Sequence, residues 1–193
     1  NYYMVNLTYS SGREEQSFGA PYTRDRKQYD VEIKNQLSPS VRHTLQWRHK
    51  RTGEQGYGLT ALRMTADEYQ VGVIVSQGAL QFLPGISYLR FSDRLSGGAG
   101  RGVVVNQQMI VRRPGQGEIR SEVELRSLTR QRPFSQPEFL VTEGRRFGRS
   151  ARISLAVDYS LKKTWRITVN VTDQIFEGRS SEFMGRGELV AQF

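Results

Sequence analysis

The stretch from residue 151 to residue 172 has the clearest pattern of hydrophobic and polar positions in the chain. Every second residue is apolar or aromatic between residues 151 and 159, and the same alternation returns between residues 165 and 172. Because successive side chains of a β-strand point to opposite faces, the pattern predicts a strand–turn–strand hairpin. One face of this hairpin is apolar and the other is polar.

Two aromatic residues, Tyr159 and Trp165, bracket the predicted turn on the apolar face. In a soluble β-sandwich, large aromatic side chains are expected in the middle of the core. In an outer-membrane β-barrel, aromatic residues ring the apolar band where it meets water, and the turns on the inner side are short. The position of Tyr159 and Trp165 therefore favours a barrel.

Shorter runs of the same alternation predict strands along the rest of the chain. They cover residues 3–9, 29–34, 41–49, 57–66, 69–76, 87–91, 103–111, 119–126 and 139–142, and a last strand that ends at Phe193. With the hairpin, this makes about twelve strands and no convincing helix. No linker or change of composition divides the chain, so a single all-β domain over residues 1–193 is expected.

Three turns share a pattern in which a leucine follows one strand and the next strand opens shortly afterwards. They begin at Leu37, Leu95 and Leu161, and in the order of twelve strands all three fall on the same side of a meander. Bacterial outer-membrane barrels have an even number of strands and short turns on the inner side. The sequence thus predicts an antiparallel up-and-down transmembrane β-barrel of about twelve strands. A soluble β-sandwich with its apolar faces packed together is the alternative.

Composition narrows the classes of protein further. Hydrophobic residues make up 37% and charged residues 24% of the chain, which excludes a disordered tail. No run of about 18 apolar residues exists, so a membrane-spanning helix is not expected. The chain has no cysteine, hence no disulfide and no thiolate nucleophile. It begins at Asn1, which fits either a removed signal peptide or a sequence that starts inside a longer one.

The C-terminal part of the chain resembles Gram-negative outer-membrane β-barrel proteins. The resemblance is carried by residues 158–171, by the polar loop after them and by a last strand that ends in Phe193, similar to the insertion signal of that class. The same region is similar in style to the small twelve-stranded porins for acidic oligosaccharides. The resemblance covers about the last forty residues well and the rest by rhythm alone. It implies an outer-membrane location.

On a barrel, the polar faces of the strands would line the lumen. The charged lumen candidates are Lys34, Arg42, Arg48, Arg120, Glu122, Glu124, Arg126, Arg152, Asp158 and Arg166. With further carboxylates at Asp30, Glu32 and Glu188, the signs nearly balance. An open anion-selective pore is expected to carry more arginine, whereas balanced charges could pair across strands and narrow or fill the lumen. Two functions therefore stay open: a narrow channel for small or acidic solutes, and a structural barrel within a complex of envelope proteins.

The net charge of +9 has its basic excess at predicted turns. The basic residues expected on the outer rim are Lys50, Arg51, Arg112, Arg113, Arg145, Arg146, Arg149 and Arg179. They could bind lipopolysaccharide phosphates, because arginine matches phosphate bidentately, or they could be solvated rim charges. The residues expected at the membrane interface are the aromatics Trp47, Tyr159, Trp165 and Phe193. No basic arm or nucleic-acid motif is present, so nucleic acid is not an expected partner.

Catalytic chemistry finds little support in the sequence. His43 and His49 are the only histidines and share a strand face with Trp47, as packed or interface residues would. The glycine-rich run at residues 97–102 lacks the Lys-Ser/Thr of a phosphate-binding loop. We expect no enzyme activity, no metal and no cofactor; an outer-membrane lipid-modifying enzyme is the least favoured alternative. A soluble sandwich would instead belong to an exported or viral assembly, with a periplasmic, extracellular or virion location.

Overall fold

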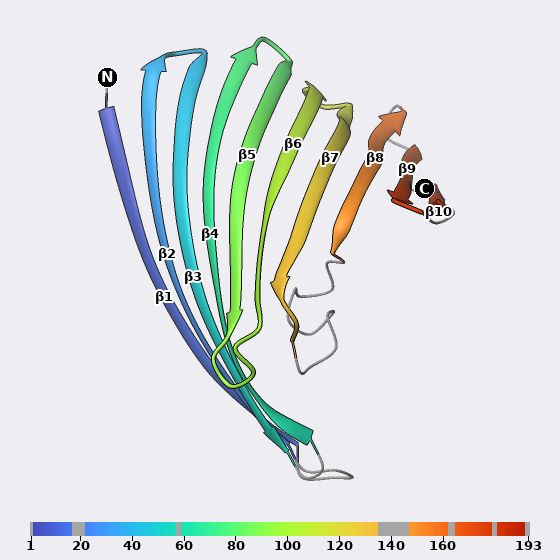
Figure 1. Cartoon of the computed structure of the whole chain (residues 1–193). Helices are drawn as coiled ribbons and strands as arrows, with labels where there is room; N and C mark the ends of the chain where they lie inside the picture. The colour runs from blue at the N-terminus through green and yellow to red at the C-terminus, as the bar shows by residue number, and fades with distance from the viewer. Residues whose placement is uncertain are drawn as a thin grey trace.

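The described residues form one continuous antiparallel sheet of ten strands in the computed structural model of the chain (Figure 1). The structure describes residues 2–16, 22–56, 59–134, 147–161, 165–178 and 181–191. Each strand pairs with the next one along the chain. The strands are β1 (Tyr2–Gln16), β2 (Tyr22–Ser38), β3 (Val41–Gly56), β4 (Leu59–Gln77), β5 (Leu80–Asp93), β6 (Ala99–Arg113), β7 (Gly117–Arg132), β8 (Gly148–Leu161), β9 (Trp165–Phe176) and β10 (Glu182–Ala191).

The prediction of twelve strands is wrong in its count, mainly because of β4. Residues 57–66 and 69–76 were expected as two strands joined at Asp67, yet β4 runs through this point and Asp67 pairs with His49 of β3. Between Met64 and Tyr69 the apolar residues change from even-numbered to odd-numbered positions. The reason is that Met64 packs in a buried cluster on one face of the strand, whereas Tyr69 is exposed on the opposite face. The strand predicted at residues 139–142 lies outside the described residues.

The two ends of the sheet differ in how the strands are connected. The end called here the short-turn end carries the tight turns after β2, β4 and β6, with Gly78 and Gly115 at positive φ (57° and 72°); glycine adopts this conformation without strain. At the opposite, long-connection end, β7 and β8 are joined by residues 133–147. The turn at Leu95 lies at the long-connection end, since the merged β4 shifts the order of the turns. Its predicted place beside the turns at Leu37 and Leu161 is therefore wrong.

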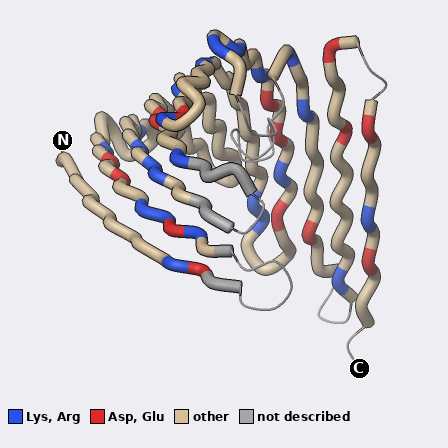
Figure 2. Tube along the Cα trace, turned by 60° about the horizontal axis from the view of Figure 1, so that its bottom comes forward, with Lys and Arg blue, Asp and Glu red and all other residues tan. Residues whose placement is uncertain are grey.

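The sheet is curved like a trough (Figure 2). Its two faces differ in composition. Side chains on a concave face converge and cover one another, so alternation of burial along a strand identifies the faces. In β5, Ile86 and Tyr88 are exposed, whereas Ser87 and Leu89 are buried. The convex face is thus the apolar one. A directly paired apolar row crosses nine strands of this face: Val5, Ile33, Leu45, Val71, Ile86, Val105, Leu125, Ala151 and Ile175.

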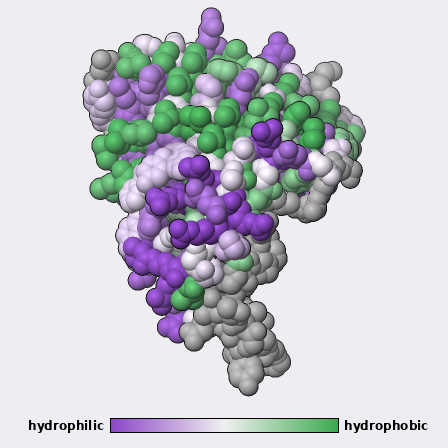
Figure 3. All heavy atoms as spheres, in the orientation of Figure 1, coloured by the Kyte–Doolittle hydropathy of each residue, from purple (hydrophilic) through white to green (hydrophobic). Residues whose placement is uncertain are grey.

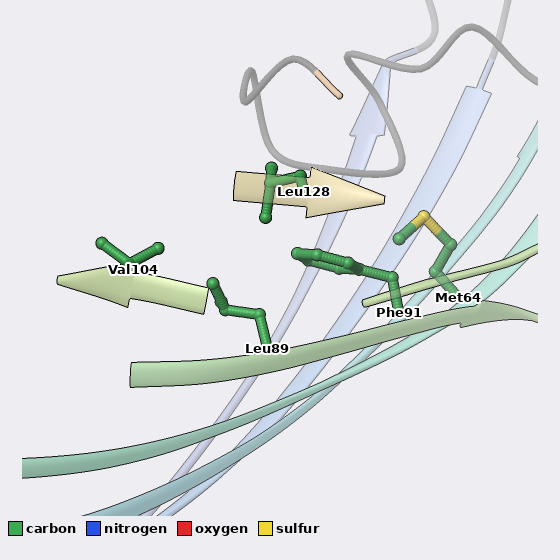
Figure 4. Close-up of a cluster of buried hydrophobic side chains, with 5 residues drawn as sticks. All are labelled: Met64, Leu89, Phe91, Val104 and Leu128. Carbon is green, nitrogen blue, oxygen red and sulfur yellow. The ribbon is translucent and has the colours of Figure 1, made fainter. Parts of the chain in front are cut away.

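A small buried core lies on the concave face toward the long-connection end. Its members come from β4, β5, β6 and β7 and are Met64, Leu89, Phe91, Val104 and Leu128 (Figure 4). Phe134 and Phe147, at the two described ends of the β7–β8 connection, pack against it. Glycines of β6 provide the room, because a Cβ added at Gly100 would lie 2.8 Å from Phe147 Cε1. This cluster holds both ends of the connection against the inner wall.

The sheet has two open edges. Among the described residues, β1 pairs only with β2 and β10 pairs only with β9. The two edges lie on opposite sides of the molecule (Figure 1). A single sheet with an exposed apolar face does not fit the alternative of a soluble sandwich, whose apolar faces would pack together. The described residues contain no helix that is long and apolar enough to cross a membrane.

Candidate functional site on the concave face

The concave face carries all of the charged side chains that the sequence places in the lumen. The strand register puts Lys34, Arg42, Arg48, Arg120, Glu122, Glu124, Arg126, Arg152, Asp158 and Arg166 on this face. Basic and acidic residues are interspersed along the strands (Figure 2). The register therefore determines which charges can meet across neighbouring strands.

Arg48 of β3 joins three strands. Its Nε lies 2.7 Å from Asp30 Oδ1 of β2, and its Nη1 lies 3.2 Å from Glu68 Oε2 of β4. Gln28 Nε2 donates a further hydrogen bond of 2.6 Å to Asp30. Since Asp30, Arg48 and Glu68 are direct register partners, the ion pairs run straight across the sheet. Cross-strand pairs of this kind stabilise a sheet in addition to satisfying the charges.

A second set of pairs follows β6 to β9. Glu118 accepts a 2.6 Å hydrogen bond from Arg112 and another of 2.6 Å from Arg120. Arg152 Nη2 lies 2.8 Å from Glu122 Oε1. Other pairs on this face are Arg126 with Glu124, Lys34 with Glu32, and Arg166 with Asp158.

Arg166 and Asp158 form the best-aligned pair. Two hydrogen bonds, from Nε to Oδ1 at 2.9 Å and from Nη2 to Oδ2 at 2.5 Å, join them in the bidentate geometry that guanidinium and carboxylate favour. The concave face is therefore polar but close to electrically neutral. It can contact water without presenting a strong field of one sign.

Arg42 differs from the other predicted lumen residues. It is exposed, and within the described part of the chain its side chain has no carboxylate or other polar partner. It lines a hollow of about 170 Å³ at the short-turn end, beside Ser40 and Gln81. This is the position on the predicted lumen face where a small anion could meet an uncommitted guanidinium.

The basic residues predicted on one outer rim lie at both ends of the sheet. Lys50, Arg51 and Arg149 lie at the long-connection end. Arg112 and Arg113 instead end β6 beside the β6–β7 turn, at the short-turn end. Their placement is corrected for the same reason as the turn at Leu95: the merged β4 reverses the direction of the strands after it. Other predicted residues, Arg145, Arg146, Arg179 and Phe193, lie outside the described residues.

Aromatic rings lie on the convex face near both ends of the apolar region. Toward the long-connection end, Tyr9 and Tyr29 have ring centroids 4.9 Å apart, and Trp47 stacks on His49 at 6.0 Å. The sequence analysis did not name these two tyrosines among the interface aromatics, although each lies at one end of an alternating apolar run. At the short-turn end, Trp165 is 44% exposed. Tyr159, also at this end, donates its hydroxyl to Gln116 Oε1 at 2.7 Å.

The two histidines lie far apart on β3, and His49 contacts its neighbours in the sheet. His49 Nδ1 lies 2.6 Å from Asp67 Oδ1, its register partner on β4. Its Nε2 accepts a hydrogen bond of 3.1 Å from Arg51. His43 lies on the same face of β3, near the short-turn end. The two rings are six positions apart along one strand, roughly 20 Å, so they cannot act on one substrate atom together.

Known structures share this arrangement of strands. CdiB from Acinetobacter baumannii matches with a TM-score of 0.60 and 10% sequence identity, over 100% of this chain and 42% of that chain. The siderophore receptor PirA from Pseudomonas aeruginosa matches with a TM-score of 0.53 and 9% identity, over 98% of this chain and 37% of that chain. Both are Gram-negative outer-membrane β-barrel proteins. The chain has an outer-membrane β-barrel type of fold.

The match confirms the predicted class of fold and gives no closer relationship. At 10% identity or less, the likeness concerns the arrangement of strands alone. The chain spans about two-fifths of the length of these two proteins. No protein-family model matches the sequence, and no curated protein matches it. Both matched proteins are of the outer membrane, which is the location that the sequence predicts for this chain.

Proposed function

We propose that the chain forms the wall of an outer-membrane β-barrel, with its convex face in lipid and its concave face lining an aqueous lumen. The observation that carries this proposal is the reversal of the usual burial pattern. Leu7 is 75% exposed and Leu45 is 50% exposed on the convex face, whereas Ser87 is 5% exposed on the concave face. A continuous apolar surface of this size is unfavourable in water, and lipid chains would cover it.

The connections support an orientation in the membrane. Outer-membrane barrels have short periplasmic turns and longer extracellular loops. We therefore place the short-turn end, where β1 starts and β10 ends, in the periplasm. On the face that Figure 3 shows, hydrophobic residues gather toward the short-turn end and hydrophilic ones toward the long-connection end. The apolar band would then lie in the membrane, and the far ends of β1 to β4 would extend outside the cell.

The open edges must be paired in such a membrane. No water is available in the hydrocarbon to satisfy the backbone groups of β1 and β10, so only closed barrels span it with strands. We propose that further strands complete the barrel, because the matched barrel proteins are more than twice as long as the part that this chain matches. Direct pairing of β1 with β10 is the competing closure, since ten strands leave these edges antiparallel.

A thiol cross-linking experiment distinguishes closure by further strands from direct pairing of β1 with β10. The chain has no native cysteine, so only the introduced thiols can react. Asn6→Cys on β1 is combined in turn with Met184→Cys, Arg186→Cys and Glu188→Cys on β10, and a short bifunctional thiol reagent is added to the folded protein. Asn6→Cys with Glu32→Cys, which are paired in the structure, is the positive control. Closure by further strands predicts cross-linking in the control only. Efficient cross-linking of one β1–β10 pair within a single chain would establish direct closure instead.

The paired charges of the concave face are compatible with a narrow channel for small or acidic solutes, which we propose in preference to a filled lumen because Arg42 has no paired carboxylate among the described residues. Carboxylates held by arginine leave a wall that is polar but nearly neutral, and Arg42 adds an uncommitted cation at the short-turn end. We expect a modest preference for anions, which Arg42→Gln should reduce; Arg113→Gln on the convex face is the control. Conductance in planar bilayers with acidic and neutral solutes measures this preference. A protein that inserts but does not conduct would favour a structural barrel in an envelope complex.

The membrane assignment itself is tested by refolding the chain with and without detergent. A barrel folds only in detergent or lipid, and the unheated folded form migrates differently from the boiled form on a denaturing gel. A monodisperse folded protein in plain buffer would refute the assignment.

A further inference from the structure

A cluster of exposed cations lies on the convex face at the long-connection end. Lys27 of β2 pairs in register with Arg51 of β3, and Arg63 of β4 pairs with Gly53 one step further along. Arg94 follows β5, and its backbone N–H donates to the Arg63 carbonyl oxygen at 2.9 Å. These four cations line one hollow of about 330 Å³. Four segments that are separate in the sequence thus bring their positive charges together.

These cations lack the counter-charges that the arginines of the concave face have. In the described residues, the side chains of Lys27, Arg63 and Arg94 form no hydrogen bond or ion pair. Arg51 donates its Nε to His49 Nε2 at 3.1 Å, and this histidine already contacts Asp67. The carboxylate that lines the hollow, Asp25, has its Oδ1 3.9 Å from Arg13 Nε. A group of like charges is unfavourable unless an anion joins it.

The hollow lies next to the aromatic rings of the convex face. Lys27 and Arg51 are each two residues beyond an aromatic ring on the same strand face, Tyr29 and His49. Two residues of a strand correspond to roughly 7 Å. Aromatic rings mark the level of the lipid head groups, so the hollow lies at the height where head-group phosphates would be. Its position toward the long connections corresponds to the outward-facing leaflet.

We propose that this hollow binds a phosphate of a phosphorylated glycolipid in the outward-facing leaflet. Guanidinium groups bind phosphate oxygens through paired hydrogen bonds, and Arg63 and Arg94 are free to do so. The hollow has the volume of a small ligand site, which suits a phosphate together with part of the sugar that carries it. The inference rests on the membrane orientation given under the proposed function. Of the basic residues that the sequence predicts at the lipid-contacting rim, this hollow contains only Arg51.

The test measures binding of a diphosphorylated glycolipid, lipid A, to the refolded protein in neutral detergent micelles. The double variant Arg63→Gln/Arg94→Gln should weaken binding about tenfold or more, because two charge-assisted contacts are lost. The matched control is Arg113→Gln/Arg186→Gln, which removes the same charge on β6 and β10, away from the hollow. It should retain wild-type affinity. Equal weakening by both double variants would overturn the site, since it would indicate a non-specific effect of net charge.

A folding check of each variant and a competition with inorganic phosphate complete the test. Each variant is first examined for the folded band of an unheated gel, so failure of the barrel proposal is distinguished from failure of the site. If Arg63→Gln/Arg94→Gln does not fold, Lys27→Gln replaces it, with an expected weakening of a few fold. Inorganic phosphate serves as a competitor. Displacement of lipid A only at high millimolar phosphate supports a lipid site, whereas displacement at micromolar phosphate would show a site for the free ion and overturn the proposal.

Discussion

Both faces of the sheet carry arginine, but the arginines have opposite surroundings. On the concave face, Arg48 and Arg152 each lie within 3.2 Å of a carboxylate on a neighbouring strand. On the convex face, Arg63 and Arg94 have exposed side chains and share one hollow. The difference arises from the register, because side chains of one face meet only those of the same face. The face on which a charged residue lies therefore says more about its function than the total number of charges of each sign.

The largest expected effect concerns the apolar cluster inside the trough. Phe91→Ala should lower the free energy of unfolding by about 3–5 kcal/mol, because Phe91 is 2% exposed and the cavity would not collapse. The control is Tyr88→Ala on the convex face of the same strand, where the ring is 41% exposed. Urea unfolding in detergent, followed by tryptophan fluorescence, measures both variants. Equal destabilisation would mean that the two faces of β5 do not differ as described.

A charge placed on each face of β9 sharpens the comparison. Val169→Arg should destabilise the protein by about 2–4 kcal/mol in a bilayer, since the new guanidinium would lie in lipid. Thr168→Arg places the same group on the concave face beside its register partners Asp158 and Glu188. We expect this variant to stay within about 0.5 kcal/mol of the wild type. Reversible unfolding in lipid vesicles gives both values, and a tolerated Val169→Arg would place the convex face in water.

A smaller effect is expected from the ion pairs of the concave face. Arg48→Met leaves Asp30 and Glu68 without their cation. The side chain of Arg48 is 39% exposed, so water in the lumen offsets part of the loss and the cost should be about 1 kcal/mol. A double-mutant cycle of Arg48→Met with Glu68→Gln isolates the pair in denaturant unfolding. A coupling energy near zero would show that this pair is a solvated contact without influence on stability.

Local alternation is sufficient to predict the sheet and its two faces, but not the register. The hairpin over residues 151–172 appears as β8 and β9, and every predicted lumen residue lies on the concave face. The errors arise where tertiary packing overrides the local pattern. Met64 moves an apolar position to the concave face, and the resulting change of phase looked like a turn. Because the prediction divided β4 into two strands, it placed Arg112 and Arg113 at the wrong end of the sheet.

The convex cation cluster could not be predicted for a related reason. Lys27, Arg51, Arg63 and Arg94 are distant in sequence, and only the pairing of strands brings them into one hollow. The sequence does contain a weak signal. Lys27 and Arg51 each continue an alternating run beyond an aromatic residue, as a basic rim beyond an aromatic belt would. Without knowledge of the register, this signal does not distinguish a lipid site from a solvated turn.

The most direct test of the central claim uses two adjacent residues of β3, because Leu45 lies on the convex face and Gln46 on the concave face. Leu45→Cys and Gln46→Cys each introduce a single thiol into a protein that has none. Each variant is inserted into lipid vesicles and treated with a water-soluble maleimide that does not enter lipid. A barrel wall predicts rapid labelling at position 46 and protection at position 45 until the protein is denatured. Rapid labelling at position 45, with protection at position 46, would contradict it, because it would place the apolar face in water and the polar face out of it.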